Sequence, residues 1–340
     1  MKEIRTQDAV GHVLCHDITQ IIKGVTKDAA FRKGHVVKAE DIPALLSLGK
    51  ENLFVWEKQD GMLHEDEAAE ILYEICAGEY MRPSGIKEGK IEVIADRDGL
   101  FLVDIGRLSA VNRLGEMMIA TRHSGFPVKE GDKLAGTRVI PLVIEAAKME
   151  KARLAGGGSP LLTLRPFREK SAGIVATGSE VFHGRIEDTF TPVIEAKLAE
   201  YGAKAREKIK LPDAPEEITS AILSMIQNGA DMVFCTGGMS VDPDDRTPLA
   251  IKNTGAEIVS YGAPVLPGAM FMLAYHKGRI PIVGLPGCVM YAERTIFDLV
   301  LPRLMADVPV TAEWLADLGH GGLCLNCGVC TYPNCGFGKG

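Results

Sequence analysis

Short apolar runs alternate with amphipathic stretches through the second half of the chain. Strand-like runs lie near 172–176, 204–210, 231–236, 256–260 and 280–284. Helical spacing of apolar residues is found over about 189–201, 215–228, 246–254 and 288–305. Strands that alternate with helices predict a parallel sheet with helices on both faces, so we expect a three-layer α/β/α domain over 171–306.

The pattern before this domain is different. Residues 1–58 combine strand signals with one short helix, which predicts a small α+β region. Residues 59–155 begin with an amphipathic helix at 65–77 and continue with strand signals, so we expect a helix followed by a small β-rich domain. The run Gly-Gly-Gly-Ser-Pro from Gly156 predicts a linker over 156–170.

Length and charge argue against two classes of function. The chain has 340 residues and a formal net charge of -7, whereas a nucleic-acid surface needs clustered lysine and arginine to neutralise phosphates. No apolar run is as long as a membrane span, and the polar start MKEIRTQD does not resemble a signal peptide. We therefore expect a cytoplasmic protein that binds neither nucleic acid nor membranes.

Cysteines are concentrated near the end of the chain. Four of the eight are Cys324, Cys327, Cys330 and Cys335. A thiol cluster in a long cytosolic chain favours metal ligation over disulfides. The spacing resembles the ferredoxin iron–sulfur signature, but four thiolates also suit zinc, so we expect a [4Fe-4S] cluster or Zn²⁺. We assign 307–340 to a helix followed by this metal-binding tail.

Three of the predicted strands end in glycine-containing loops. They are TGSEV at 177–181, TGGMSVDPDD at 236–245 and GLPG at 284–287, which we call the first, second and third loops. In a parallel α/β sheet, ligands bind where loops leave the carboxyl ends of strands, and glycines let backbone N–H groups approach a phosphate. Three such junctions in one sheet predict a shared phosphate-binding crevice.

The second loop also carries three acids, Asp242, Asp244 and Asp245. Acids this close together repel one another unless water or a cation lies between them. Carboxylate oxygens are ligands that Mg²⁺ prefers, so we expect Asp244 and Asp245 to bind it.

Together the three loops resemble, in sequence and in order, the signature loops of the molybdopterin-binding domain. That domain is shared by molybdopterin molybdotransferases, molybdopterin adenylyltransferases and the competence-damage-inducible protein family. The resemblance implies catalytic roles for Asp245 and Asp242. It implies cofactor-binding roles for Thr177, Gly178, Ser179, Glu180, Thr236, Gly237, Gly238, Ser240, Pro286 and Gly287. A weaker resemblance to molybdotransferases covers 1–58.

The chain departs from the molybdotransferase pattern at several positions. That family usually has Asp where this chain has Ser179, and Gly where it has Asp242. It commonly continues the third loop with Asn-Pro-Val-Ser, where this chain has Cys-Val-Met-Tyr at 288–291. It also places two lysines around the pair Pro267-Gly268, where this chain has none, so anion-binding groups are missing.

The resemblance implies a protein that binds molybdopterin or its adenylate and inserts molybdate into the dithiolene, with Mg²⁺ neutralising phosphate charge. The missing lysines favour an alternative, a non-catalytic molybdopterin carrier or chaperone. The run DPDDRT resembles the competence-damage-inducible version of the second loop and favours another, a hydrolase or nucleotidyltransferase acting on nucleotide-like pyrophosphates. Expected partners are molybdopterin, molybdate, and a molybdo-enzyme or other cofactor-assembly proteins. A homo-oligomer is left open.

Overall fold

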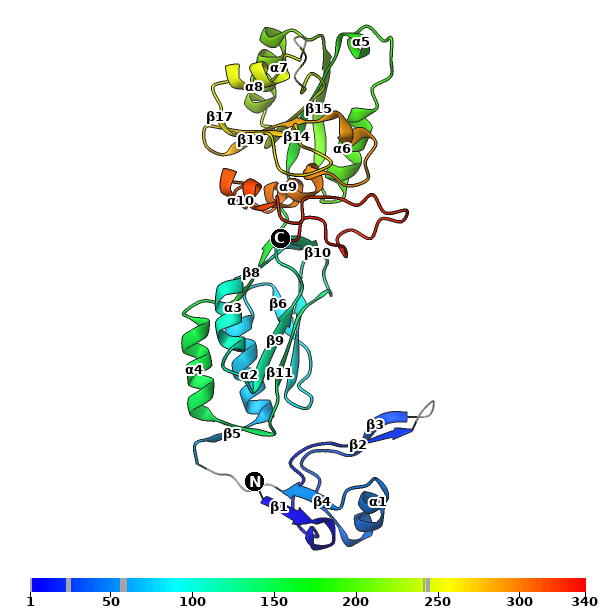
Figure 1. Ribbon diagram of the computed structural model, residues 1–340, viewed down its shortest axis with the longest axis vertical. Helices are drawn as coiled ribbons and strands as arrows, with labels where there is room; N and C mark the ends of the chain where they lie inside the picture. The colour runs from blue at the N-terminus through cyan, green and yellow to red at the C-terminus, as the bar shows by residue number, and fades with distance from the viewer. Residues whose placement is uncertain (1, 23–25, 56–59, 241, 243–244) are drawn as a thin grey trace. The chain divides into compact units, whose positions relative to one another are not determined.

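A computed structural model of the chain describes residues 2–22, 26–55, 60–240, 242 and 245–340 (Figure 1). The chain forms two compact units. Unit 1 contains Met1–Asp96, Val103–Arg122 and Glu130–Leu164. Unit 2 contains Arg97–Leu102, His123–Lys129 and Arg165–Gly340.

The N-terminal part of unit 1 is a small α+β region. Two antiparallel strand pairs form it, β1 (Lys2–Arg5) with β4 (Asn52–Val55), and β2 (Ile18–Ile22) with β3 (Thr26–Phe31). Its helical turns are η1 (Thr6–Asp8), η2 (Ala39–Asp41) and α1 (Ile42–Ser47). Leu14, Leu45 and Leu53 fill its small core.

The rest of unit 1 combines a sheet with helices. Four antiparallel strands lie in the order β6 (Met81–Pro83), β7 (Lys90–Ala95), β11 (Lys133–Val139) and β9 (Met117–Thr121). A separate antiparallel pair joins β5 (Met62–His64) to β12 (Val143–Glu145). The helices are α2 (Glu65–Cys76), α3 (Ile105–Asn112) and α4 (Ala146–Gly156).

Helix α3 lies in the region that we expected to be β-rich. Asp104 caps it by accepting a hydrogen bond from the backbone N–H of Arg107 at 3.0 Å. The Arg107 guanidinium then donates to the carbonyl oxygens of Gly156 at 2.7 Å and Ser159 at 2.8 Å. These bonds hold the start of the expected linker, and a strand, β13 (Leu162–Pro166), follows within the same stretch.

Unit 2 is built on a six-stranded sheet with helices on both faces (Figure 1). Its strand order is β15 (Lys204–Leu211), β14 (Ser171–Thr177), β16 (Met232–Thr236), β19 (Ile280–Leu285), β18 (Met272–His276) and β17 (Glu257–Tyr261). The helices are α5 (Ser179–Phe182), α6 (Phe190–Ala199), α7 (Pro215–Gln227), α8 (Thr247–Asn253), η3 (Gly287–Met290), α9 (Ile296–Met305) and α10 (Ala312–Asp317). The predicted α/β class is confirmed.

Alternate residues of the central strands face two different cores. On β14, Ile174 packs with α6 and α9, whereas its neighbour Val175 packs with α7 and α8. Burial on both faces is typical of parallel strands and accounts for their continuous apolar sequence. Strand β8 (Gly99–Val103) pairs antiparallel with β10 (Phe126–Val128) in a separate three-stranded sheet.

One strand, β18, was not predicted and runs against the others. It pairs antiparallel with both β19 and β17. The turn between β18 and β19 contains Lys277 and Gly278, both with positive φ, which permits a tight reversal. A hairpin of this kind forces antiparallel pairing, so the expected parallel sheet becomes mixed at one side.

The cysteine-rich tail packs on the same core as the sheet of unit 2. Leu266 and Leu323 form a parallel bridge, and the backbone N–H of Cys324 donates to the Leu266 carbonyl oxygen at 2.8 Å. Phe337 is only 4% exposed and belongs to the core beside α9. The tail is therefore an integral part of unit 2.

None of the helices in the described residues combines the length and the hydrophobicity of a membrane-spanning segment.

We predict that Glu65 makes unit 1 sensitive to pH. Glu65 is 7% exposed at the start of α2, and burial together with the charge of Asp66 raises its pKa from 4.5 to about 7. The folded state therefore holds this proton more tightly than the unfolded chain. Its contribution to stability is complete below pH 4.5 and is lost as the pH rises through 7, by up to roughly 3 kcal/mol.

Denaturant unfolding at several pH values measures this loss. Glu65→Gln should remove most of it, while Glu70→Gln, at an exposed position of the same helix, should leave it in place. An unchanged pH dependence in Glu65→Gln would contradict the assignment.

Candidate functional site

The first, second and third loops leave the same edge of the sheet. They follow β14, β16 and β19, which are neighbouring parallel strands. In register, Ala176 pairs with Thr236, and Thr236 pairs with Leu285. The three carboxyl ends are therefore side by side, as expected for a ligand site of an open α/β sheet.

The ends of β14 and β16 are joined through Thr177. Its hydroxyl donates to the Thr236 carbonyl oxygen at 3.1 Å and lies 3.1 Å from the Thr247 hydroxyl at the start of α8. Gly237 has a φ of +83°, and a Cβ at this position would overlap the Thr177 carbonyl oxygen. Glycine is thus required at 237 for the first and second loops to meet.

A cavity of about 310 Å³ opens beside this junction, and we call it the loop pocket. The described residues that line it come from the first and second loops, from the segment before α6, from the loop after β15 and from η3. They are Thr177, Gly178, Glu180, Val181, Ile186, Glu187, Asp188, Thr189, Phe190, Asp213, Gly237, Gly238, Asp245 and Met290.

The loop pocket is strongly acidic. Its described lining has five carboxylates and no lysine, arginine or histidine; the acids are Glu180, Glu187, Asp188, Asp213 and Asp245. Three of these acids, Asp188, Asp213 and Asp245, already accept hydrogen bonds within the protein. Asp213 accepts from the Ser179 backbone N–H at 2.9 Å, and Asp188 accepts from the Thr191 hydroxyl at 2.7 Å. An anionic ligand would need a cation to bind among such groups.

Hydrogen bonds to backbone groups hold the described part of the second loop in place. The Asp245 backbone N–H donates to the Asp242 carbonyl oxygen at 2.9 Å, and the Asp242 N–H donates to the Asp245 carboxylate at 3.1 Å. The Tyr261 hydroxyl donates to the carbonyl oxygens of Met239 at 3.1 Å and Ser240 at 3.3 Å. Burial and the charge of Asp245 raise the pKa of Tyr261, so this hydroxyl keeps its proton.

Only part of the predicted site lines the loop pocket. Among the predicted residues, those in the lining are Thr177, Gly178, Glu180, Gly237, Gly238 and Asp245. The described residues that were predicted but do not line it are Ser179, Thr236, Ser240, Asp242, Pro286 and Gly287. Asp244 lies outside the described residues. No described residue of the third loop lines the loop pocket, but Met290, at the end of η3 just after this loop, does.

Two of the predicted residues outside the lining of the loop pocket are Ser179 and Thr236. The Ser179 hydroxyl donates to Asp213 at 3.1 Å, so this side chain faces an acid. Thr236 is 0% exposed, and its hydroxyl has no hydrogen-bond partner among the described residues.

Asp213 is a site residue that the sequence reasoning missed. It follows β15, which pairs with β14 at the edge of the sheet. The rule that pointed to the three loops applies to this strand end as well, because β15 is parallel to β14. The signal was present in Leu-Pro-Asp at 211–213, but it lacks the glycines that drew attention to the other loops.

No group of three or more His, Cys, Asp or Glu side chains in the described part of the chain is arranged to hold a metal ion. The tail thiols Cys324, Cys327, Cys330 and Cys335 are free. All four line a second cavity, of about 370 Å³, together with the segment Tyr291–Arg294, and we call it the tail cavity.

The part of the chain that contains the three loops matches a known protein family. Residues 173–306 match the family described as "Probable molybdopterin binding domain". This part of the chain belongs to that domain family. The resemblance carried by the three loops is thereby confirmed. Residues 3–57 match a domain family of unknown function.

Individual relatives cover only parts of the chain. A molybdopterin molybdenumtransferase of Synechococcus elongatus is 24% identical over 198 residues, which are 54% of this chain and 46% of that protein. A protein of Pyrobaculum calidifontis is 37% identical over 161 residues, 42% of this chain and 61% of its own. A CinA-like protein of Mycobacterium tuberculosis is 34% identical over 89 residues, 26% of this chain and 21% of its own. The chain therefore spans less than two thirds of each of these relatives.

Solved structures with a similar fold include MoaB, a molybdopterin biosynthesis enzyme from Thermus thermophilus. It is 22% identical with a TM-score of 0.34, covering 42% of this chain and 97% of that one. CinA from Thermoplasma acidophilum is 17% identical with a TM-score of 0.34, covering 42% of this chain and 99% of that one.

We predict that Gly237→Ala destabilises unit 2. A residue with a Cβ pays about 1–2 kcal/mol for a left-handed backbone, and the overlap with the Thr177 carbonyl oxygen adds to this cost. Gly287→Ala is the matched control, because a Cβ there would meet no atom within 4 Å. Denaturant unfolding should show a clearly lower free energy of unfolding for Gly237→Ala only. Equal stabilities of the two variants would contradict the close approach.

Proposed function

We propose that unit 2 binds molybdopterin, or its adenylate, at the loop pocket and takes part in molybdenum cofactor biosynthesis. The observation that carries this proposal is that two of the three loops that resemble the molybdopterin-binding signature line one cavity, within the part of the chain that matches this domain family. Gly178, Gly237 and Gly238 contribute backbone and no side chains to this lining. Phe190 and Met290 add apolar surface that suits a flat pterin ring.

We propose that Mg²⁺ joins the phosphate of this ligand to the acids of the loop pocket. Mg²⁺ commonly keeps several waters and binds one or two carboxylates together with substrate phosphates. Such a site does not need three protein acids at one point, so it agrees with the arrangement of the described residues. Glu180 and Asp245 are the acids of the first and second loops that line the pocket, and they are the proposed ligands. Asp244 is proposed on sequence alone.

The reaction that fits this ligand best is insertion of molybdate into the dithiolene. Mg²⁺ would offset the negative charges of molybdate and phosphate, which the acidic lining would otherwise repel. Asp245, with Asp242 beside it in the same loop, is the proposed catalytic acid. The molybdopterin molybdenumtransferase relative supports this reaction, although it aligns over only part of its length.

A specific observation favours a second candidate, a molybdopterin carrier without catalytic activity. The described lining of the loop pocket contains no cationic side chain to hold molybdate. The Pro267-Gly268 loop, which lacks the lysines of molybdotransferases, packs against Ile296 of α9 at Gly268 and against the tail at Leu266. The match to a CinA-like protein keeps a pyrophosphate hydrolase or nucleotidyltransferase as a third candidate.

We propose that the four tail cysteines hold a thiolate-bound metal centre, either [4Fe-4S] or Zn²⁺. The shared tail cavity supports this role. Docking to a molybdo-enzyme or to other cofactor-assembly proteins, assembly into a homo-oligomer and a cytoplasmic location remain predictions from the sequence.

We predict that pterin binding depends on Mg²⁺ and on Asp245. Removal of one carboxylate ligand should weaken the binding of molybdopterin by roughly tenfold or more when Mg²⁺ is present. Fluorescence or calorimetric titration of Asp245→Asn, with and without Mg²⁺, measures this. Glu216→Gln removes the same charge at an exposed position of α7 and should bind normally. Equal affinities of Asp245→Asn and the unmodified chain would place the ligand elsewhere.

We predict molybdate incorporation from adenylated molybdopterin in a Mg²⁺-dependent reaction. Asp245→Asn should lower the rate strongly, since it removes both charge and a metal ligand. Transfer of the product to an apo-molybdoenzyme measures incorporation. Tight pterin binding with no incorporation of molybdate or tungstate would eliminate the transferase and leave the carrier.

A further inference from the structure

The tail cavity lies between two segments that are far apart in the sequence. One wall contains all four tail cysteines, and the other is the segment Tyr291–Arg294 that follows the third loop. The described lining also includes Glu293, Asn326 and Thr331. Four cysteines thus line one space of about 370 Å³ within a single compact unit.

Both ends of the cysteine segment are fixed to unit 2. At its start, the Cys324 N–H is bonded to the Leu266 carbonyl oxygen at 2.8 Å. At its end, the Tyr332 hydroxyl donates to the Asp298 carbonyl oxygen at 3.1 Å, and Phe337 is buried in the core. Cys324 and Cys335 are half-buried, whereas Cys327 and Cys330 are exposed between them. Cys324 and Cys335 therefore pack against the core of unit 2, whereas the other two cysteines lie at its surface.

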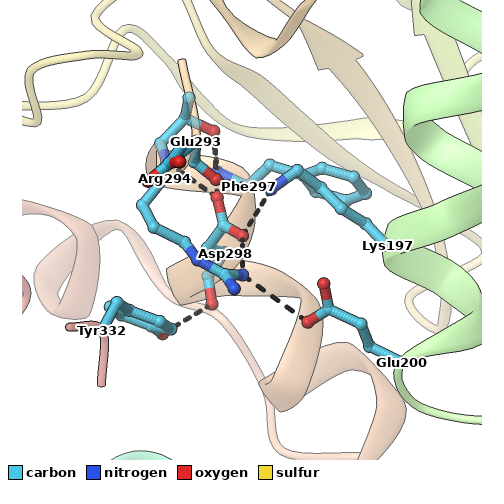
Figure 2. A network of polar contacts seen from close by, with 8 residues as sticks. Lys197, Glu200, Glu293, Arg294, Phe297, Asp298 and Tyr332 are labelled. Carbon is cyan, nitrogen blue, oxygen red and sulfur yellow. Dashed lines mark hydrogen bonds and ion pairs between the residues drawn. The ribbon is translucent and has the colours of Figure 1, made fainter. Parts of the chain in front are cut away.

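A polar network around Asp298 connects Arg294 and Tyr332, two residues that line the tail cavity (Figure 2). Asp298 is 4% exposed and accepts hydrogen bonds from Lys197 at 2.6 Å and Arg294 at 2.8 Å. The Arg294 guanidinium lies 4.9 Å from the ring centre of Tyr332 and 3.5 Å from Glu200. Burial acts to lower the pKa of Arg294, but its bond to Asp298 and the nearby negative charges leave it raised, so a fixed positive charge lines the tail cavity.

The tail cavity suits a cluster better than a single ion. Four thiolates around one zinc lie about 2.3 Å from it, so their sulfur atoms must come within roughly 4 Å of one another. In the described residues, no three such ligands approach a single point. Each cysteine of a [4Fe-4S] cluster binds a different iron, so the four thiols need only surround a common space. The tail cavity provides that space, and it is far larger than one ion.

We propose that the tail cavity holds an iron–sulfur cluster, ligated by Cys324, Cys327, Cys330 and Cys335 and set against the segment that follows the third loop. This inference rests on the proposed metal-binding role of the tail and does not depend on pterin binding. Arg294, which is also paired with Asp298 and Glu200, is the positive charge in the described lining beside the cluster. Met290 lines the loop pocket and Tyr291 lines the tail cavity, so consecutive residues join the cluster site to the proposed pterin site.

The first test is the composition of the full chain purified without oxygen. We expect about four iron atoms and four sulfide ions per chain, with broad visible absorption and a paramagnetic signal after reduction by dithionite. Cys327→Ala and Cys330→Ala, at exposed positions, should lose most of the iron. Cys76→Ala is the control, because Cys76 is buried in unit 1 with a pKa raised to about 12 and should leave iron content unchanged. Stoichiometric zinc, or protein free of metal, would overturn the proposal.

The second test concerns the position of the cluster. Removing the positive charge in Arg294→Gln should lower the reduction potential, because a reduced cluster carries more negative charge. Arg294→Lys should restore it, and Lys252→Gln, outside the lining of the tail cavity, should not change it. An unchanged reduction potential in Arg294→Gln would show that the cluster does not lie in the tail cavity.

The third test uses molybdopterin as a probe. Molybdopterin added to the reduced protein should alter the paramagnetic spectrum, since one segment lines both spaces. Binding that is detected calorimetrically but leaves the spectrum unchanged would overturn the shared wall while the proposed function stands. If the protein carries the cluster but does not bind molybdopterin, the proposed function is wrong and the cluster assignment stands.

Discussion

The site of unit 2 depends on how closely the backbones of β14 and β16 approach at their carboxyl ends. Thr177 and Gly237 are in contact there, and only a residue without a Cβ can occupy position 237. The Thr177 hydroxyl extends the junction to Thr247, so the start of α8 is set by the same contact. The first and second loops therefore form one continuous surface.

Much of this arrangement could be predicted from the sequence, because parallel strands that are buried on both faces leave a strong pattern. The strand ends and their glycines indicated the edge of the sheet at which the loop pocket lies. Asp213 was missed because it follows a strand whose sequence is largely polar and whose loop has no glycine. Strand β18 and its antiparallel direction were not predicted, because they depend on a hairpin turn and not on the periodicity of apolar residues.

Side-chain roles were harder to predict than backbone positions. Ser179 was expected to face a ligand, but its hydroxyl is bonded to Asp213, a partner from a distant part of the chain. Arg107 carried no signal in the sequence, although its bonds to three backbone carbonyl oxygens hold the segment after α4. Contacts between residues far apart in the sequence decide both cases, and a local pattern does not contain them.

The position of Tyr291 links two departures from the family pattern that look unrelated in the sequence. Molybdotransferases commonly have Asn-Pro-Val-Ser after the third loop, and this chain has Cys-Val-Met-Tyr followed much later by a cysteine-rich tail. Because Tyr291 lines the cavity that the tail encloses, the altered segment and the tail form one structural module. A change in either segment therefore alters a wall of the space that the other one lines.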